Sequence, residues 1–234
     1  MKITHRQLRQ IIREVIYHDT VSGPAISIIP SGASNFVIAY DSSMLVSEID
    51  RLNSLGVTSP NEYQIYSYSP ERYYPLDMIY SGVVVEEDDS RGPCNGAKHV
   101  SAAASRIAKQ GWGTVVYLAA LDELGPIGPD RGSIKPGAEA LWRSFERRND
   151  IIRTPYDDIS NPKTPDPRDD CKVLYMKDVY VNSSYQPIDE IDAPGVKDMR
   201  AMGIQVEVQL SDRWPLASRV LMKVFNEVFQ SVYR

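Results

Sequence analysis

A short glycine turn is the pattern in this chain that most directly predicts chemistry. Gly111-Trp112-Gly113 follows a run expected to be extended and opens a helix expected over residues 114 to 124. Glycine lets a backbone approach a phosphate closely, and the first N–H groups of a helix donate into a region of positive potential. The main-chain donors of Gly111, Trp112, Gly113 and Thr114 therefore predict a cradle for a pyrophosphate.

Two nucleotide-binding motifs do not fit this turn. A P-loop needs Gly-Lys followed by Ser or Thr, and no such sequence follows Gly113. A dinucleotide fingerprint needs Gly-x-Gly-x-x-Gly, and Val116 occupies the third glycine position. By itself the turn is equally compatible with an ordinary glycine-rich turn, so its surroundings decide between the two.

Several side chains are of types that suit proton transfer. Glu86 and Glu87 end a run expected to be a buried strand, and either could act as a base through water. A solvated acidic strand end is the simpler interpretation. Histidine titrates near neutral pH, so His99 is a second candidate base, with a structural role as its alternative. Tyr117 could protonate a departing thiolate as a general acid, or pack in the core.

Cysteine and metal chemistry have weaker support in the sequence. The chain has two cysteines, and pairing Cys171 with His99 as its base would make a cysteine hydrolase, which is our third functional hypothesis. The aspartates Asp166, Asp169 and Asp170 lack the glycine and the terminal glutamate of a calcium loop. We therefore expect no metal site.

Composition predicts one globular domain with appended segments. The chain has 234 residues, of which 42% are hydrophobic and 24% charged, enough for a substantial core. Its net charge of −5 disfavours a broad nucleic-acid-binding surface. No stretch approaches the roughly 18 apolar residues of a membrane span, and the start lacks the order of a secretory signal. We expect a cytoplasmic protein that has neither membrane nor nucleic acid as a partner.

Hydrophobic periodicity predicts an α+β fold. Strands are expected over residues 25 to 29, 35 to 40, 62 to 68, 76 to 87, 97 to 102, 172 to 181 and 204 to 210. Helices are expected over residues 45 to 55, 114 to 124 and 136 to 148. In this order a strand, the glycine turn and a buried helix follow one another, so the end of the sheet would present a phosphate-bearing ligand.

Amphipathic helices are expected at both ends of the chain. Residues 1–20 contain an apolar stripe flanked by arginines, which either packs on the domain or serves as a targeting or assembly tag. Residues 21–210 would form the main domain, with a Pro/Asp-rich loop at 154–171. Residues 211–234 carry a second apolar stripe and would pack on the domain or on a partner.

Several sequence runs, including the glycine turn, resemble those of one protein family. The runs Pro93-Cys94-Asn95-Gly96-Ala97, Gly111-Trp112-Gly113 and Gly128-Pro129-Asp130-Arg131-Gly132-Ser133 resemble the acetyl-CoA-binding segment of GNAT-like N-acetyltransferases, in the divergent version encoded by tailed bacteriophages. The resemblance covers residues 93 to 171, about a third of the chain. It implies a mixed, mainly antiparallel sheet flanked by helices.

The resemblance also implies roles for individual residues. A splayed strand would hydrogen-bond the pantetheine arm and a glycine loop would hold the pyrophosphate, which assigns cofactor binding to Val100, Ser101, Lys109, Gly111, Trp112, Gly113 and Thr114. Asp130 and Arg131 would lie on the acceptor side. Glu87, His99 and Tyr117 are the catalytic candidates. The chain departs from the family at Ala108, where the family pattern has Gln or Arg three residues before the first glycine.

The implied function is an acetyl-CoA-dependent N-acetyltransferase that moves an acetyl group to an unidentified amine of a small molecule or protein. Its setting would be the cytoplasm of an infected bacterial host. The alternative is a non-catalytic, GNAT-derived binding or virion-associated phage protein, whose terminal helices dock on phage or host proteins. Ala108 and the lack of an obvious acid favour this alternative.

Overall fold

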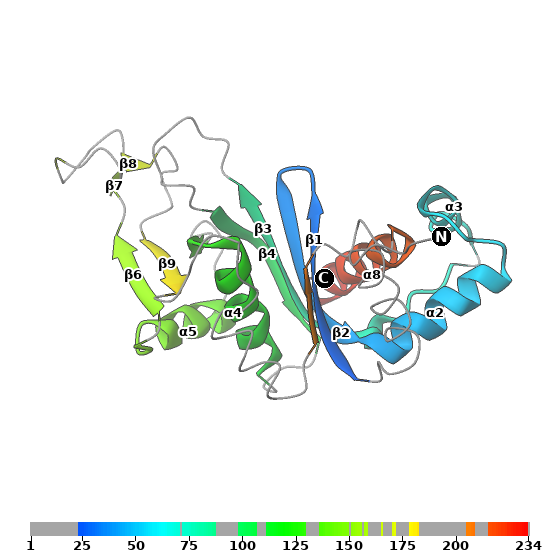
Figure 1. Cartoon of the computed structure of the whole chain (residues 1–234), viewed down its shortest axis with the longest axis horizontal. Helices are drawn as coiled ribbons and strands as arrows, with labels where there is room; N and C mark the ends of the chain where they lie inside the picture. Colours follow the sequence, from blue (N-terminus) through cyan, green and yellow to red (C-terminus); the bar gives the residue numbers. More distant parts are fainter. Residues whose placement is uncertain are drawn as a thin grey trace, which may run out of the picture.

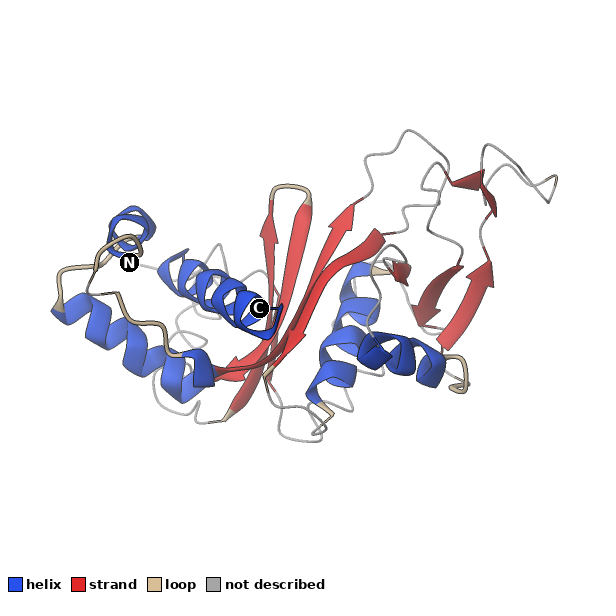
Figure 2. Cartoon of the chain, turned by 180° about the vertical axis from the view of Figure 1, so that it is seen from behind, coloured by secondary structure: helices blue, strands red, loops and turns tan. Residues whose placement is uncertain are grey.

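The fold is built on one mixed sheet with helices on both faces (Figures 1 and 2). The computed structural model of the chain describes residues 23–70, 72–87, 98–106, 111–129, 136–149, 151–155, 157–158, 165, 170–171, 178–182, 205–208 and 215–233. The strands are β1 (Pro24–Ser31), β2 (Ser34–Asp41), β3 (Ile79–Glu87), β4 (Lys98–Ser105), β5 (Ile127–Pro129), β6 (Ile151–Pro155), β7 (Asp157–Asp158), β8 (Asp170–Cys171), β9 (Asp178–Asn182) and β10 (Gln205–Val208). The helices are α2 (Ser42–Ser54), α3 (Pro60–Tyr66), the 3-10 turn η1 (Leu76–Met78), α4 (Trp112–Leu124), α5 (Pro136–Phe145) and α8 (Pro215–Tyr233).

The described strands of the main sheet follow the order β10-β1-β2-β3-β4-β5-β9-β6. The β1–β10 and β4–β5 pairs are parallel, and the other neighbours are antiparallel. Strands β7 and β8 form a separate parallel pair. The predicted α+β class and the mainly antiparallel sheet with flanking helices are confirmed.

Each face of the sheet has its own apolar core, because successive side chains of a strand point to opposite faces. Val84 packs with the helices α2, α3 and α8, whereas Val83 and Val85 pack with α4 and α5. Figure 1 shows the same division, with α4 and α5 on one side of the sheet and α2, α3 and α8 on the other. The central strands are therefore buried on both faces.

Local capping explains where α2 begins and ends. The Asp41 carboxylate accepts hydrogen bonds from the backbone N–H groups of Ser43 (2.9 Å) and Met44 (3.1 Å), as expected of an N-cap. Gly56 has φ +78°, a conformation that favours glycine, just beyond the end of the helix. The helix expected over residues 45 to 55 is confirmed, with an earlier start.

The strand predicted over residues 62 to 68 is wrong, because this segment lies largely in helix α3. The Ser59 hydroxyl accepts from the Glu62 N–H at 3.3 Å, and the Glu62 carboxylate accepts from the Ser59 N–H at 2.9 Å. Pro60 occupies the first helical turn, where its missing N–H costs nothing. This capping box was readable in the sequence and outweighs the weak alternation.

Helix α8 carries the apolar stripe expected near the C-terminus. Val220, Leu221, Val224, Phe225 and Val228 are fully buried against the sheet and the neighbouring helices. The predicted helix in residues 1–20 lies outside the described residues. In the part of the chain that the structure describes, no helix is both long and apolar enough to cross a membrane.

A glycine-to-alanine change at Gly82 tests how closely α8 approaches the sheet. A Cβ at Gly82 would lie 2.6 and 2.7 Å from ring carbons of Phe225, so Gly82→Ala should lower the free energy of unfolding by about 1–3 kcal/mol. Urea unfolding measures the loss. Gly137→Ala is the control, since nothing lies within 4 Å of its added Cβ.

A double mutant shows whether the loss of stability in Gly82→Ala comes from the clash with Phe225. Phe225→Leu removes the clashing ring, so it should cost less stability in the Gly82→Ala background than in the wild type. Equal costs in the two backgrounds would contradict the close approach of Phe225 to Gly82.

Candidate functional site

The glycine turn opens helix α4, two residues earlier than predicted. Gly111 is the N-cap residue and has φ +84°, in the left-handed region that favours glycine. Its carbonyl accepts from the N–H of Val115 at 3.1 Å, which closes the first helical turn. Glycine has no side chain to cap the N–H groups of this turn, so an anionic ligand is one partner that suits them.

An aromatic stack fixes the start of α4 to the sheet. The Trp112 ring stacks on the Tyr80 ring of β3, with centroids 4.8 Å apart. The Tyr80 hydroxyl in turn donates to the Asp41 carboxylate at 3.1 Å. Burial and the hydrogen bond to Asp41 raise the pKa of Tyr80. Burial acts to raise the pKa of Asp41, but hydrogen bonds from Ser43, Met44 and Tyr80 lower it overall.

Arg106 follows β4 directly and is the basic residue between this strand and the turn that the structure describes. The Arg106 backbone N–H donates to the Tyr80 carbonyl at 3.1 Å, and its guanidinium is 2.5 Å from the Asp77 carboxylate. Both side chains are partly or largely exposed. The positive charge next to the turn is therefore partly compensated, and Lys109, which was predicted to bind the cofactor, lies outside the described residues.

Strand β4 contains a bulge at Ser101. In the ladder with β3, Val85 pairs with Val100 and Val84 pairs with Ala102, so Ser101 is the additional residue. The parallel ladder with β5 ends nearby, at Val100 and Pro129, whereas β4 continues to Ser105. Bulges frequently redirect side chains next to active sites. The predicted residues Val100 and Ser101 thus lie where β4 changes its pairing.

Glu86 and His99 face each other across the ladder between β3 and β4. His99 Nε2 lies 3.6 Å from Glu86 Oε2, and the Ser34 hydroxyl donates to Glu86 Oε1 at 3.5 Å. The His99 side chain is 14% exposed and that of Glu86 is 41% exposed, so solvent and ligands can reach the pair. A carboxylate beside an imidazole can orient the ring, and an oriented imidazole suits a general base.

Glu86, rather than the predicted Glu87, is the carboxylate next to His99. Glu87 is opposite Lys98 in the ladder, and its side chain lies outside the description. Alternation could have identified Glu86, which shares a strand face with Val84. Its contact with His99, however, depends on the register between two strands that are joined through residues 88–97.

Tyr117 lies in the core between α4 and α5. It is 4% exposed, and its ring packs edge-on against Trp142 at 5.2 Å and beside Phe145 at 6.3 Å. This packing accounts for the aromatic side chain. A role for its hydroxyl as the general acid stays a prediction.

Of the predicted site residues that the structure describes, His99, Val100 and Ser101 lie on β4, whereas residues 111 to 114 and Tyr117 belong to the start and first turns of α4. His99 lies near the start of β4, Gly111 follows the last residue of β4 by six positions, and the seven strand residues from His99 to Ser105 extend about 20 Å. An extended ligand with phosphates at the glycine turn could therefore reach the Glu86–His99 pair at its other end. Asp130 and Arg131 lie outside the described residues.

The described residues form neither a Cys–His pair for a cysteine hydrolase nor a metal site. The backbone of Cys171 lies in β8, apart from the sheet that carries His99. Within the described ranges, no group of three or more His, Cys, Asp or Glu residues is arranged to hold a metal ion.

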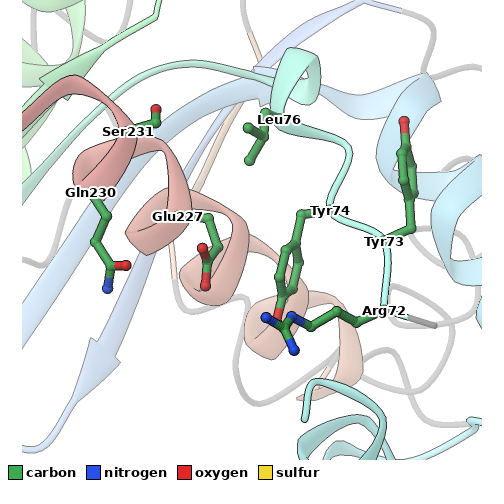
Figure 3. Close-up of a pocket in the computed structure, with 7 residues that line it drawn as sticks. All are labelled: Arg72, Tyr73, Tyr74, Leu76, Glu227, Gln230 and Ser231. Carbon is green, nitrogen blue, oxygen red and sulfur yellow. The ribbon is translucent and has the colours of Figure 1, made fainter. Parts of the chain in front are cut away.

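A cavity of about 270 Å³ lies between α8 and the segment that leads into η1. Figure 3 shows Arg72 and Tyr74 on one side and Glu227 and Gln230 of α8 on the other. Its wall combines both signs of charge with an aromatic ring.

No protein-family model, curated protein or solved structure matches the chain. The function of the site is therefore inferred from its residues, its geometry and the sequence resemblance over residues 93 to 171.

Substitutions at the two glycines of the turn test its conformation. Gly111→Ala should lower the free energy of unfolding by about 1–2 kcal/mol, because alanine is strained at φ +84°. Gly113→Ala should not lower it, since Gly113 lies within α4 and nothing is within 4 Å of its added Cβ. Chemical denaturation of both variants measures the contrast, and equal stabilities would contradict the left-handed cap.

Proposed function

We propose that the protein is a GNAT-like, acetyl-CoA-dependent N-acetyltransferase that transfers an acetyl group to an amine. The observation that carries the proposal is the sequence of features along β4. A bulge at Ser101, the end of the parallel ladder with β5 at Val100, and the left-handed glycine turn into α4 follow one another. The resemblance in residues 93 to 171 implies a splayed strand followed by a glycine loop that opens the next helix, which is why we favour acetyl-CoA over other phosphate-bearing ligands.

In the proposed complex the cofactor lies along β4. Its pyrophosphate accepts hydrogen bonds from the main chain of Gly111, Trp112, Gly113 and Thr114, where the helix also supplies positive potential. The pantetheine arm is an extended chain with two amides, which can hydrogen-bond a strand much as a neighbouring strand does. It extends past Ser101, and the thioester lies near the Glu86–His99 pair.

The Glu86–His99 pair supplies the base in the proposed reaction. His99 accepts a proton from the acceptor ammonium, and the Glu86 carboxylate stabilises the imidazolium that forms. The neutral amine attacks the thioester carbonyl, a C–N bond forms, and the C–S bond breaks. The nitrogen loses its second proton as the amide forms, and the departing thiolate takes up a proton through water, because the predicted acid Tyr117 packs with α4 on the face of the sheet opposite to Glu86 and His99. Asp130 and Arg131 orient the acceptor.

The second candidate is a non-catalytic protein derived from the same fold and associated with a phage virion. Two observations favour it. Ala108 replaces the family's Gln or Arg before the glycine turn, and Tyr117 is engaged in aromatic packing. This candidate would bind a ligand or partner without turning it over, so binding and catalysis have to be measured separately.

Acetyl-CoA binding is tested by thermal and chemical unfolding. Acetyl-CoA at a hundredfold excess over its Kd should stabilise the protein by about 2.7 kcal/mol. S-acetylpantetheine, which lacks the phosphates, should stabilise it much less. Thr114→Glu should weaken acetyl-CoA binding at least about tenfold through charge repulsion, while an acidic residue in the first helical turn preserves stability.

The matched control places the same charge elsewhere. Ala140→Glu adds a carboxylate to an exposed position of α5 and should leave acetyl-CoA binding unchanged. If acetyl-CoA fails to stabilise the wild type at millimolar concentration, the acetyltransferase proposal is refuted.

Catalysis is tested at His99 by the release of free coenzyme A thiol in the presence of amines. His99→Ala should lower kcat/KM by about a hundredfold or more with little change in the Kd for acetyl-CoA, because a general base contributes at least that much. Glu86→Gln should lower kcat in the same direction. Glu139→Gln, an exposed change on α5, should have no effect.

Binding of acetyl-CoA without thiol release by any amine would favour the non-catalytic candidate. Turnover that is undiminished in His99→Ala would instead show that another group is the base.

A further inference from the structure

A groove of about 230 Å³ separates α3 from α8 on the face of the sheet that carries Glu86 and His99. Tyr63 and Tyr68 line it from α3 and the turn after it, and Phe36 lines it from β2. Met222 contributes an apolar side chain from α8. This volume is below that of a drug-sized pocket, so the groove suits a small ligand with an apolar or aromatic body.

The charged residues that line the groove are all basic. Arg219 and Lys223 are four residues apart on α8 and therefore lie on one face of the helix, and none of the lining residues is acidic. Arg219 is exposed and forms no ion pair with any residue that the structure describes. The amides of Gln64 and Asn226 add donors. The groove can thus neutralise and hydrogen-bond an anionic group.

Lys223 forms the boundary between this groove and the cavity of Figure 3. Its ammonium is 3.3 Å from the Glu227 carboxylate and lies over the Tyr74 ring at 5.7 Å. Glu227 lines the neighbouring cavity rather than the groove. The two hollows beside α8 therefore differ in charge, and Arg219 is the groove's cation that has no acidic partner among the described residues.

The sheet register brings the groove close to the Glu86–His99 pair. Ser34 pairs with Glu86 in the ladder, and Phe36 of the groove pairs with Val84. Ser34 and Phe36 are two residues apart, so they share a strand face and are separated by about 7 Å. Ser31 also lines the groove and pairs with Ser34 at the end of the hairpin. A small ligand in the groove would thus be near the proposed base.

We propose that this groove binds the acceptor and selects an amine that carries a carboxylate on an aromatic or apolar body, an inference that rests on the proposed acetyltransferase function. Arg219 and Lys223 bind the carboxylate, Phe36 and Tyr68 contact the body, and the amine is directed toward His99. An amine of the same shape without a carboxylate leaves the cations without a partner and binds more weakly.

The first test measures binding without acetyl-CoA. L-Phenylalanine and 2-phenylethylamine differ by one carboxylate, and calorimetry or ligand-observed NMR should show at least about tenfold tighter binding of L-phenylalanine. Arg219→Gln and the double variant Arg219→Gln, Lys223→Gln should abolish that preference. Arg143→Gln, which removes an exposed cation from α5, should retain it.

The second test links the groove to acetyl transfer. With acetyl-CoA saturating, the same amine preference should appear in kcat/KM for thiol release, and the Arg219→Gln variant should lose it while its Kd for acetyl-CoA stays unchanged. If the wild type shows no preference for the carboxylate in binding, or if the charge variants retain the preference, the groove proposal is overturned.

Failure of the groove proposal is distinguishable from failure of the proposed function. Binding of acetyl-CoA and transfer to amines without regard to their charge would leave the acetyltransferase standing and overturn the groove assignment. Carboxylate-selective binding in a protein that acetyl-CoA does not stabilise would overturn both the acetyltransferase and the role of the groove as its acceptor site.

Discussion

The contact between Phe225 of α8 and Gly82 of β3 is the constraint on which the placement of the candidate sites depends. With glycine at position 82 the Phe225 ring can lie directly on the strand, where any Cβ would meet it at under 3 Å. The same ring meets Phe36 edge-on at 6.2 Å, which connects α8 to the neighbouring strand β2. Because α8 lies this close, its basic face forms one wall of a groove whose other wall is α3, on the same side of the sheet as Glu86 and His99.

The bulge at Ser101 reconciles two packing requirements within β4. Ala102 and Ala104 pack with the α8 side of the sheet, whereas Val100 packs with α4 on the other side. In an uninterrupted strand, residues 100, 102 and 104 would share one face. The additional residue therefore gives α8 small side chains to pack on, keeps Val100 in the opposite core, and places His99 on the α8 face opposite Glu86.

Sequence reasoning succeeded where the deciding interactions are local. The strands at residues 25 to 29 and 35 to 40, the helix at 45 to 55 and the glycine turn before α4 each depend on a few consecutive residues, and each is present. The strand predicted at residues 62 to 68 was wrong because its alternation was read without the Ser59–Glu62 capping box.

The Glu86–His99 contact and the α3–α8 groove could not be predicted, because each depends on how segments distant in the chain are placed by the sheet. Tyr117 was correctly placed in a buried helix, but periodicity alone cannot tell a core tyrosine from a catalytic one.

The distribution of charge favours binding of the two proposed anionic groups, the phosphates of acetyl-CoA and the carboxylate of the acceptor, near opposite ends of β4. Acetyl-CoA carries its phosphates at the glycine turn, where the helix terminus supplies positive potential and Arg106 is already paired with Asp77. The carboxylate of the acceptor would lie at the other end of the strand, between α3 and α8. The strand from His99 to Ser105 extends about 20 Å, more than twice the screening length of about 8 Å at physiological salt, so anions beyond its two ends repel each other little. The reacting thioester and amine, which carry no negative charge, can then meet at the Glu86–His99 pair without bringing the charged ends together.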